Sequence, residues 1–320
     1  MTSKMGLLSV FRSHPIRSGR GGLCRLGVLL MSLLLPVGSA AAATITDAQG
    51  TRVFPDNPKT VVVFDLAALD TLDALGVEVK GVPNWAMSGE LEKYRSDAYA
   101  KVGSLFEPDF EAVAALEPEL IVIGSRSQKH FAALSAIAPV LDLTPDNNDF
   151  RASVKRNAEA VGKLFGKEAD VAERLRKLDA TTARLKEVTA DKGRGLVVLT
   201  TGGKISAYGP GSRFSEVHDL YGLAAADPTI DATTHGQVIS WEYILKVNPD
   251  WLIVIDRDAA IGRADTPARA LLDNELVNRT QAAKSGQIIY LDPVGMYLTG
   301  SGLRAEQVIV DGFLAAFERP

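Results

Sequence analysis

Two arginines end matching stretches of the sequence, which makes them candidates for binding one anion together. Residues 111–126 align without a gap against residues 242–257, and each copy has an initial glutamate, a central proline, an apolar run and a final arginine. The pattern predicts a short helix, a proline turn and a strand, so Arg126 and Arg257 follow the carboxyl ends of two strands. Ligands of α/β sheets bind at that edge. We therefore expect both guanidinium groups to face a shared cleft.

A third arginine, Arg213, lies in the glycine-rich turn 208–214, which we expect to lead into a helix at Phe214. Backbone N–H groups at a helix start also favour anions. Arginine stays charged and presents a rigid fork of donors to oxygen atoms. The turn lacks the third glycine of a dinucleotide-binding motif, and no Gly-Lys-Ser/Thr follows it, so a nucleotide site is not predicted.

Histidine and tyrosine provide the candidate metal ligands. His235 is predicted in a loop, and Tyr297 in a second, glycine-flanked loop after a strand. Polar loop residues are only sometimes functional, and His130 is open to either reading. His218 falls in a short helical stretch, where packing or solvent exposure is expected. An imidazole and a phenolate oxygen are plausible ligands for ferric iron.

The elements around these residues predict an α/β fold with two α/β lobes joined by a long helical spine and a ligand cleft between the lobes. Near-continuous apolar runs, typical of strands covered on both faces, alternate with helical patterns in each half of the chain. A charged helical region separates the halves, with a break at Gly166, although an ordinary surface helix pair would show the same pattern. The predicted divisions are 1–43 signal peptide, 44–149 N-terminal lobe, 150–191 connecting spine and 192–320 C-terminal lobe.

The first 43 residues have the pattern of a cleaved secretory signal. A basic stretch precedes an apolar run from Leu26 to Val37, and small residues follow up to Ala43. The run is shorter than the roughly 20 residues of a spanning helix, so an uncleaved anchor is the weaker alternative. Cys24 lies before the apolar run, and we expect the exported protein to contain no cysteine.

Composition and missing motifs narrow the function classes. The chain has a formal net charge of −4, and the predicted signal contains basic but no acidic residues, so the exported part is more acidic still. Nucleic acid and anionic lipid are therefore not expected as partners. No nucleophile motif, metalloprotease motif or P-loop is present, and we expect a binding protein and not an enzyme, with an exported hydrolase as the minor alternative.

The strings His235-Gly236, Asp256-Arg257 and Tyr290-Leu-Asp-Pro293, with Tyr297-Leu298 beyond them, resemble the periplasmic siderophore-binding proteins of ABC iron importers, and most of all their ferric catecholate branch. The resemblance covers essentially all of the chain after the signal. It departs from the branch at residues 294–296, where Val-Gly-Met replaces the bulky aromatic residues that commonly precede the tyrosine.

The resemblance implies a role for each candidate. It implies that Arg126, Arg213 and Arg257 hold the siderophore oxygens and that His235 and Tyr297 bind Fe(III). Glu111 and Glu242 match the acidic residues that dock to the membrane permease, although a glutamate early in a helix also simply favours the helix dipole. A periplasmic monomer with no intrinsic cofactor is implied, whose partners are a ferric siderophore and an ABC permease.

Two related ligands remain as alternatives. Heme or cobalamin binding within the same class would bring the metal inside a macrocycle. Three convergent arginines would then be less necessary. A bare Zn(II) or Mn(II) ion would need three or four histidine and carboxylate ligands in the cleft, and the chain has few histidines.

Overall fold

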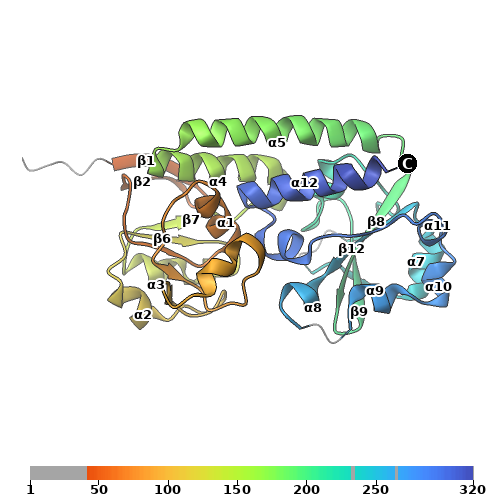
Figure 1. Ribbon diagram of the computed structural model, residues 1–320, viewed down its shortest axis with the longest axis horizontal. Coiled ribbons are helices and arrows are strands. Elements are labelled where there is room, and N and C mark those ends of the chain that lie inside the picture. The colour runs from red at the N-terminus through yellow and green to blue at the C-terminus, as the bar shows by residue number, and fades with distance from the viewer. Residues whose placement is uncertain (1–41, 232–234, 264–265, 320) are drawn as a thin grey trace, which may run out of the picture. The chain divides into compact units, whose positions relative to one another are not determined.

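The computed structural model describes residues 42–231, 235–263 and 266–319 (Figure 1). The predicted signal peptide therefore lies almost entirely outside the described residues, and its cleavage stays a prediction. In the described part of the chain, no helix has both the length and the apolar character needed to cross a membrane.

The N-terminal lobe is built on a parallel sheet with the strand order β5-β4-β3-β6-β7. Its strands are β3 (Val61–Val63), β4 (Gly81–Val82), β5 (Ala100–Lys101), β6 (Leu120–Ile123) and β7 (Val140–Asp142). A separate antiparallel hairpin consists of β1 (Ala42–Asp47) and β2 (Gly50–Pro55). The helices and 3-10 turns of this lobe are α1 (Leu66–Ala74), η1 (Gly89–Arg95), α2 (Phe110–Ala115), η2 (Gln128–His130), α3 (Phe131–Ser135) and η3 (Asn147–Asp149).

The C-terminal lobe has a mixed sheet with the order β11-β9-β8-β12-β13, and β10 also pairs with β8. Strands β8, β12 and β13 are parallel, while β9 and β11 run antiparallel to their neighbours. The strands are β8 (Arg194–Thr201), β9 (Lys204–Tyr208), β10 (Ala224–Ala225), β11 (Gln237–Ile239), β12 (Trp251–Asp256) and β13 (Ile288–Tyr290). The helices are α6 (Glu216–Asp219), α7 (Trp241–Val247), α8 (Arg257–Ala260), α9 (Ala268–Leu272), α10 (Glu275–Asn278) and α11 (Gln281–Lys284).

Successive side chains of a strand point to opposite faces of its sheet. Successive residues of the central strands are buried in different hydrophobic clusters, so both faces of each sheet are covered. In β3, Val61 and Val63 belong to one hydrophobic cluster and Val62 to another. In β8, Val197 and Val198 are divided between two clusters in the same way. The prediction of two α/β lobes from near-continuous apolar runs is confirmed.

The helical spine consists of α4 (Phe150–Phe165) and α5 (Glu168–Thr189). Gly166 ends α4 in the left-handed conformation with φ 62°, so the break expected at this glycine, as two consecutive helices or a kink, separates two consecutive helices. Val161 and Leu175 pack into the core of the N-terminal lobe, whereas Leu178 and Leu185 pack into that of the C-terminal lobe. Figure 1 shows α4 and α5 lying along the same side as α12. The exact limits of the lobes at residues 149 and 191 stay predictions.

A second helix, α12 (Leu303–Phe317), also joins the two lobes, which the sequence did not indicate. Its first residue, Leu303, belongs to the N-terminal core, and Phe313 and Phe317 belong to the C-terminal core. The helix has no side-chain cap of its own at Gly302. Instead, side chains of α1 accept hydrogen bonds from its first N–H groups, so α12 is anchored to the N-terminal lobe at its start.

Candidate ligand-binding cleft

A cavity of about 370 Å³ lies between the lobes and is lined by residues of both. This volume is within the range of small-molecule sites. Four of the predicted site residues line it: Arg126, Arg213, His235 and Tyr297. Arg257 does not line it directly, but it is hydrogen-bonded to Tyr297. The structure therefore brings all five candidates to one place.

The backbone carbonyl of Tyr297 joins arginines from the two lobes. It accepts a hydrogen bond of 2.8 Å from Nη2 of Arg126 and one of 2.7 Å from Nη2 of Arg213. Burial lowers the pKa of Arg126, and the charge of Arg213 adds to this effect. Because like charges repel, the shared carbonyl offsets part of the cost of holding the two guanidinium groups together before a ligand arrives.

The side chain of Tyr297 is surrounded by the three guanidinium groups. Their central carbons lie 4.4 Å (Arg213), 5.4 Å (Arg257) and 5.5 Å (Arg126) from the centre of the ring. Nε of Arg257 donates to the Tyr297 hydroxyl at 2.8 Å. Burial acts to raise the pKa of the Tyr297 phenol, but the hydrogen bond from Arg257 and the charges of Arg213 and Arg257 outweigh it, and the pKa is lowered.

Tyr297 lies in a π-helical turn, η4 (Gly295–Thr299), and not in the open loop that the sequence predicts. The carboxylate of Asp292 accepts the Gly295 N–H at 2.7 Å, and its carbonyl accepts the Met296 N–H at 3.0 Å. A Cβ at position 295 would lie 2.6 Å from that carboxylate, so a larger residue there would displace the Asp292 side chain from this hydrogen bond. Gly295, which departs from the siderophore-binding pattern, thus leaves room for the Asp292 carboxylate to bond the turn. Such π-turns are frequent at functional sites.

The element that holds Arg213 also differs from the prediction. Helix α6 begins at Glu216, not at Phe214, and is only four residues long, so Arg213 lies in a turn before it. That turn is held by Oγ of Ser212, which donates to the carbonyl of Gly209 at 2.6 Å. Arg213 is therefore positioned by the turn and by its hydrogen bond to the Tyr297 carbonyl, and it does not lie at a helix start.

The three histidines after the signal differ in environment. His235 is exposed and lines the cleft. Nε2 of His130 lies 3.0 Å from the Phe106 carbonyl, and Nδ1 of His218 lies 2.8 Å from the Leu223 carbonyl. In the described ranges, no group of three His, Cys, Asp or Glu side chains is placed to hold a metal ion, and the bare-metal alternative requires such a group.

Glu111 and Glu242 are both exposed and lie in the first turns of α2 and α7. The equivalent placement follows from the repeat. A hydrogen bond involving Ser240 lowers the pKa of Glu242. A negative charge in the first turn interacts favourably with the helix dipole in both copies. This position therefore has a structural explanation, and the docking role of Glu111 and Glu242 stays a prediction.

Two acidic residues of the cleft were missed by the sequence reasoning. Asp65 lines the cavity, caps α1 and is half-buried, and burial raises its pKa. It directly follows the apolar run at 60–64, so the strand-end argument used for Arg126 would have found it. Glu216 also lines the cavity, three residues after Arg213. An isolated glutamate in a short helical pattern carries no comparable signal.

Glu216 forms a buried acidic pair with Glu306 of α12. The two side chains belong to residues that are 6% and 1% exposed, and the Tyr221 hydroxyl donates to Glu306 at 2.8 Å. Burial raises the pKa of Glu216 to about 8, with the charge of Glu306 adding to it, and burial raises that of Glu306 to about 7. Both carboxyl groups therefore bind protons in the folded chain at pH values where the unfolded chain has released them.

We expect Glu306→Gln to flatten the pH dependence of stability. Because the folded state retains protons between about pH 4.5 and 7, the free energy of unfolding falls as the pH rises through that window. Removing the ionisable group should reduce the fall between pH 5 and pH 8 by about 2 kcal/mol. Urea unfolding at both pH values measures it. The exposed Glu173→Gln is the control, and an unchanged slope in Glu306→Gln would contradict the expectation.

The chain belongs to the periplasmic binding protein family, whose model matches residues 61–294. This membership agrees with the two α/β lobes and with the cleft between them. It also confirms the expectation of a binding protein and not an enzyme.

Relatives of this chain include siderophore-binding proteins. The petrobactin-binding protein YclQ of Bacillus subtilis is 46% identical over 263 residues, which cover 81% of this chain and 82% of that protein. Its crystal structure has a TM-score of 0.83 and covers 88% of this chain and 100% of its own. VctP, a periplasmic catecholate-siderophore binding protein of Vibrio cholerae, has a TM-score of 0.81 at 35% identity and covers 85% of this chain and 99% of its own. BauB, solved with ferric iron and two acinetobactin molecules, has a TM-score of 0.79 at 30% identity, covering 87% and 99%. The resemblance to siderophore-binding proteins is confirmed.

Proposed function

We propose that this protein captures a ferric siderophore with catecholate groups and delivers it to an ABC permease. The observation that carries the proposal is the meeting of three guanidinium groups from both lobes around Tyr297. A fully deprotonated catecholate chelate of Fe(III) is an anion rich in oxygen acceptors, which planar guanidinium donors match. The names of YclQ and VctP, which specify petrobactin and catecholate siderophores, support the same ligand class.

Within this proposal, Arg126, Arg213 and Arg257 hold the catecholate oxygens, and His235 and Tyr297 bind Fe(III) directly. A chelator with two catechol units leaves two positions of an octahedral iron open, which one imidazole and one phenolate fill. The lowered pKa of Tyr297 favours the phenolate that such a bond requires. The iron is cargo of the protein and not a resident cofactor.

The proposed location is the periplasm, reached through cleavage of the signal near Ala43, and the proposed working form is a monomer. The division into lobes 44–149 and 192–320 with the spine 150–191 belongs to the same proposal. Glu111 and Glu242 are proposed to dock to the permease, one from each lobe, because both are exposed and equivalent in the repeat.

Titration of the purified protein with ferric bis-catecholate and tris-catecholate chelates tests the function. We expect saturable quenching of the intrinsic fluorescence by at least one of them. Heme and a ferric hydroxamate serve as competitors of different chemistry, since neither offers catecholate oxygens to the arginines. Quenching by heme or the hydroxamate with none by either catecholate would show that the ligand class is wrong.

Tyr297→Phe and His235→Ala are expected to weaken bis-catecholate binding by about tenfold or more and to shift its charge-transfer band, because each removes a direct ligand. A six-coordinate tris-catecholate should lose much less. Tyr243→Phe is the matched control, since its hydroxyl bonds Asp227 at 2.6 Å and not a cleft residue. Equal losses for both chelates would mean that these side chains shape the cleft without touching iron.

Glu111→Ala combined with Glu242→Ala should leave chelate binding unchanged and reduce cellular uptake by about tenfold, as expected when charge pairs across an interface are removed. The control is Glu168→Ala combined with Glu275→Ala, which also removes exposed first-turn glutamates. Uptake of labelled ferric chelate is the measurement. Normal uptake in the first double variant would remove the docking assignment.

A further inference from the structure

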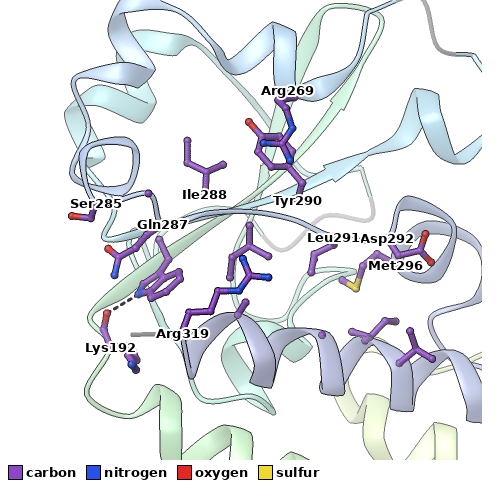
Figure 2. Close-up of a pocket in the computed structure, with 17 residues that line it drawn as sticks. Lys192, Arg269, Ser285, Gln287, Ile288, Tyr290, Leu291, Asp292, Met296 and Arg319 are labelled. Atoms are coloured by element: carbon purple, nitrogen blue, oxygen red, sulfur yellow. Dashed lines mark hydrogen bonds between the residues drawn. The ribbon is translucent and has the colours of Figure 1, made fainter.

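A second, larger cavity of about 810 Å³ lies along the outer edge of the C-terminal sheet and shares only Met296 with the described lining of the cleft. The segment 285–292, which contains β13, runs through it, and one face of α12 forms a wall. Figure 2 shows Arg269 and Tyr290 on one side of this segment and Arg319, with α12, on the other. Arg126, Arg213, His235 and Tyr297 do not line it.

Strand β13 has an open edge in this groove. It pairs with β12 alone among the described strands, and that pairing uses the Gln287 carbonyl (3.0 Å to Leu252 N) and the Leu291 N–H (3.1 Å to the Val254 carbonyl). In a parallel ladder the backbone groups of successive residues point to opposite sides, so those of residues 287, 289 and 291 face β12. The N–H and C=O groups of Ile288 and Tyr290 therefore point to the open side. Such an edge is a template for another strand.

The groove is cationic although the chain is acidic. Lys192, Arg269 and Arg319 line it, and none forms an ion pair with an acidic side chain within the part of the chain that the structure describes. Arg269 lies over the ring of Tyr290, with its central carbon 4.0 Å from the ring centre. Asp292 is the only acidic residue among the described residues of the lining, and its carboxylate already accepts the Gly295 N–H.

We propose that this groove is an interaction surface that accepts an extended acidic segment of a partner protein as an added strand along β13. The open Ile288 and Tyr290 backbone groups supply the ladder. Arg269 meets a carboxylate on one face of the added strand, and Arg319 and Lys192 meet carboxylates on its other face, since successive side chains of a strand point to opposite faces. A second copy of this chain is a poor occupant, because pairing two β13 edges would bring two sets of the same cations together. The cations and the open backbone groups of this surface do not line the cleft, so the proposal does not depend on the ligand class proposed above.

The test uses the whole protein and the peptide Glu-Glu-Thr-Val-Glu-Glu-Thr-Val, which presents carboxylates on both faces of a strand, and it measures hydrogen exchange at individual backbone amides. We expect the peptide to slow exchange at Ile288 and Tyr290 by about tenfold, since their N–H groups gain partners. Binding should weaken with added salt. The same peptide with lysine in place of glutamate is the control and should not bind.

Variants separate charge from backbone pairing. Arg269→Glu with Arg319→Glu should weaken peptide binding by about tenfold or more and leave ferric catecholate binding unchanged. Ile288→Pro removes one open N–H at a position where an edge strand tolerates proline, and it should also weaken peptide binding. Unchanged amide exchange with the acidic peptide would overturn the proposal. So would equal binding of the lysine peptide, protection by inorganic phosphate alone, or a dimer that protects these amides without peptide.

Discussion

Replacing Arg213 by alanine is expected to weaken binding of a ferric bis-catecholate by about 100-fold or more. Truncating one partner of a buried, hydrogen-bonded charge pair costs about 2–5 kcal/mol, and each 1.4 kcal/mol is about tenfold in affinity. Arg213 has the shortest approach to the Tyr297 ring, 4.4 Å, and shares the Tyr297 carbonyl with Arg126. Its loss removes a positive charge from the cleft and leaves the Tyr297 carbonyl with the hydrogen bond from Arg126. Fluorescence titration at constant ionic strength measures the change.

Two further variants decide what Arg213 contributes. Arg213→Lys keeps the charge but not the planar fork, so an intermediate loss is expected if hydrogen-bond geometry matters. Arg184→Ala is the control, because this exposed arginine pairs with Glu187 and Glu318 on the surface. Binding by Arg213→Ala as tight as that of the unaltered protein would show that the three-arginine junction does not hold the ligand.

The candidate site could be located from the sequence because the internal repeat aligns equivalent positions of the two lobes. Arg126 and Arg257 end equivalent strands, and parallel strands deliver their carboxyl ends to one edge of a sheet, so local pattern was sufficient to place both near a cleft. Gly166 was equally readable, since a left-handed residue that ends a helix is a local requirement. Such features depend on a few neighbours in the chain.

Features made by residues distant in sequence were not readable. The Tyr297 carbonyl accepts from arginines 171 and 84 residues away, and a backbone atom has no signature in the residue types. The π-turn around Tyr297 depends on the contact between Asp292 and Gly295 and was predicted as a loop. The pairing of Glu216 with Glu306 is likewise tertiary. In each of these cases packing, and not propensity, decides the local structure.

Replacing Asp70 by alanine is expected to lower the free energy of unfolding by about 3–5 kcal/mol, because it leaves two buried backbone N–H groups without their acceptor, at about 1–3 kcal/mol each, while Arg304 keeps its ion pair with Asp73. Oδ2 of Asp70 accepts the backbone N–H groups of Arg304 (3.0 Å) and Ala305 (2.9 Å), and Oδ1 accepts Nε of Arg304 at 2.9 Å. Oγ1 of the adjacent Thr71 accepts the Leu303 N–H at 3.0 Å. These atoms of α1 satisfy the start of α12, which has no cap of its own.

The consequence extends beyond one helix end, because α12 continues into the core of the C-terminal lobe through Phe313 and Phe317. Loss of the anchor therefore weakens a connection between the lobes in addition to α4 and α5. Urea unfolding should show a lower midpoint with an unchanged slope, as expected when stability alone changes. Asp170→Ala, which removes an exposed acid in the first turn of α5, is the control. If both variants unfold at the same urea concentration, the α1 side chains do not anchor the start of α12.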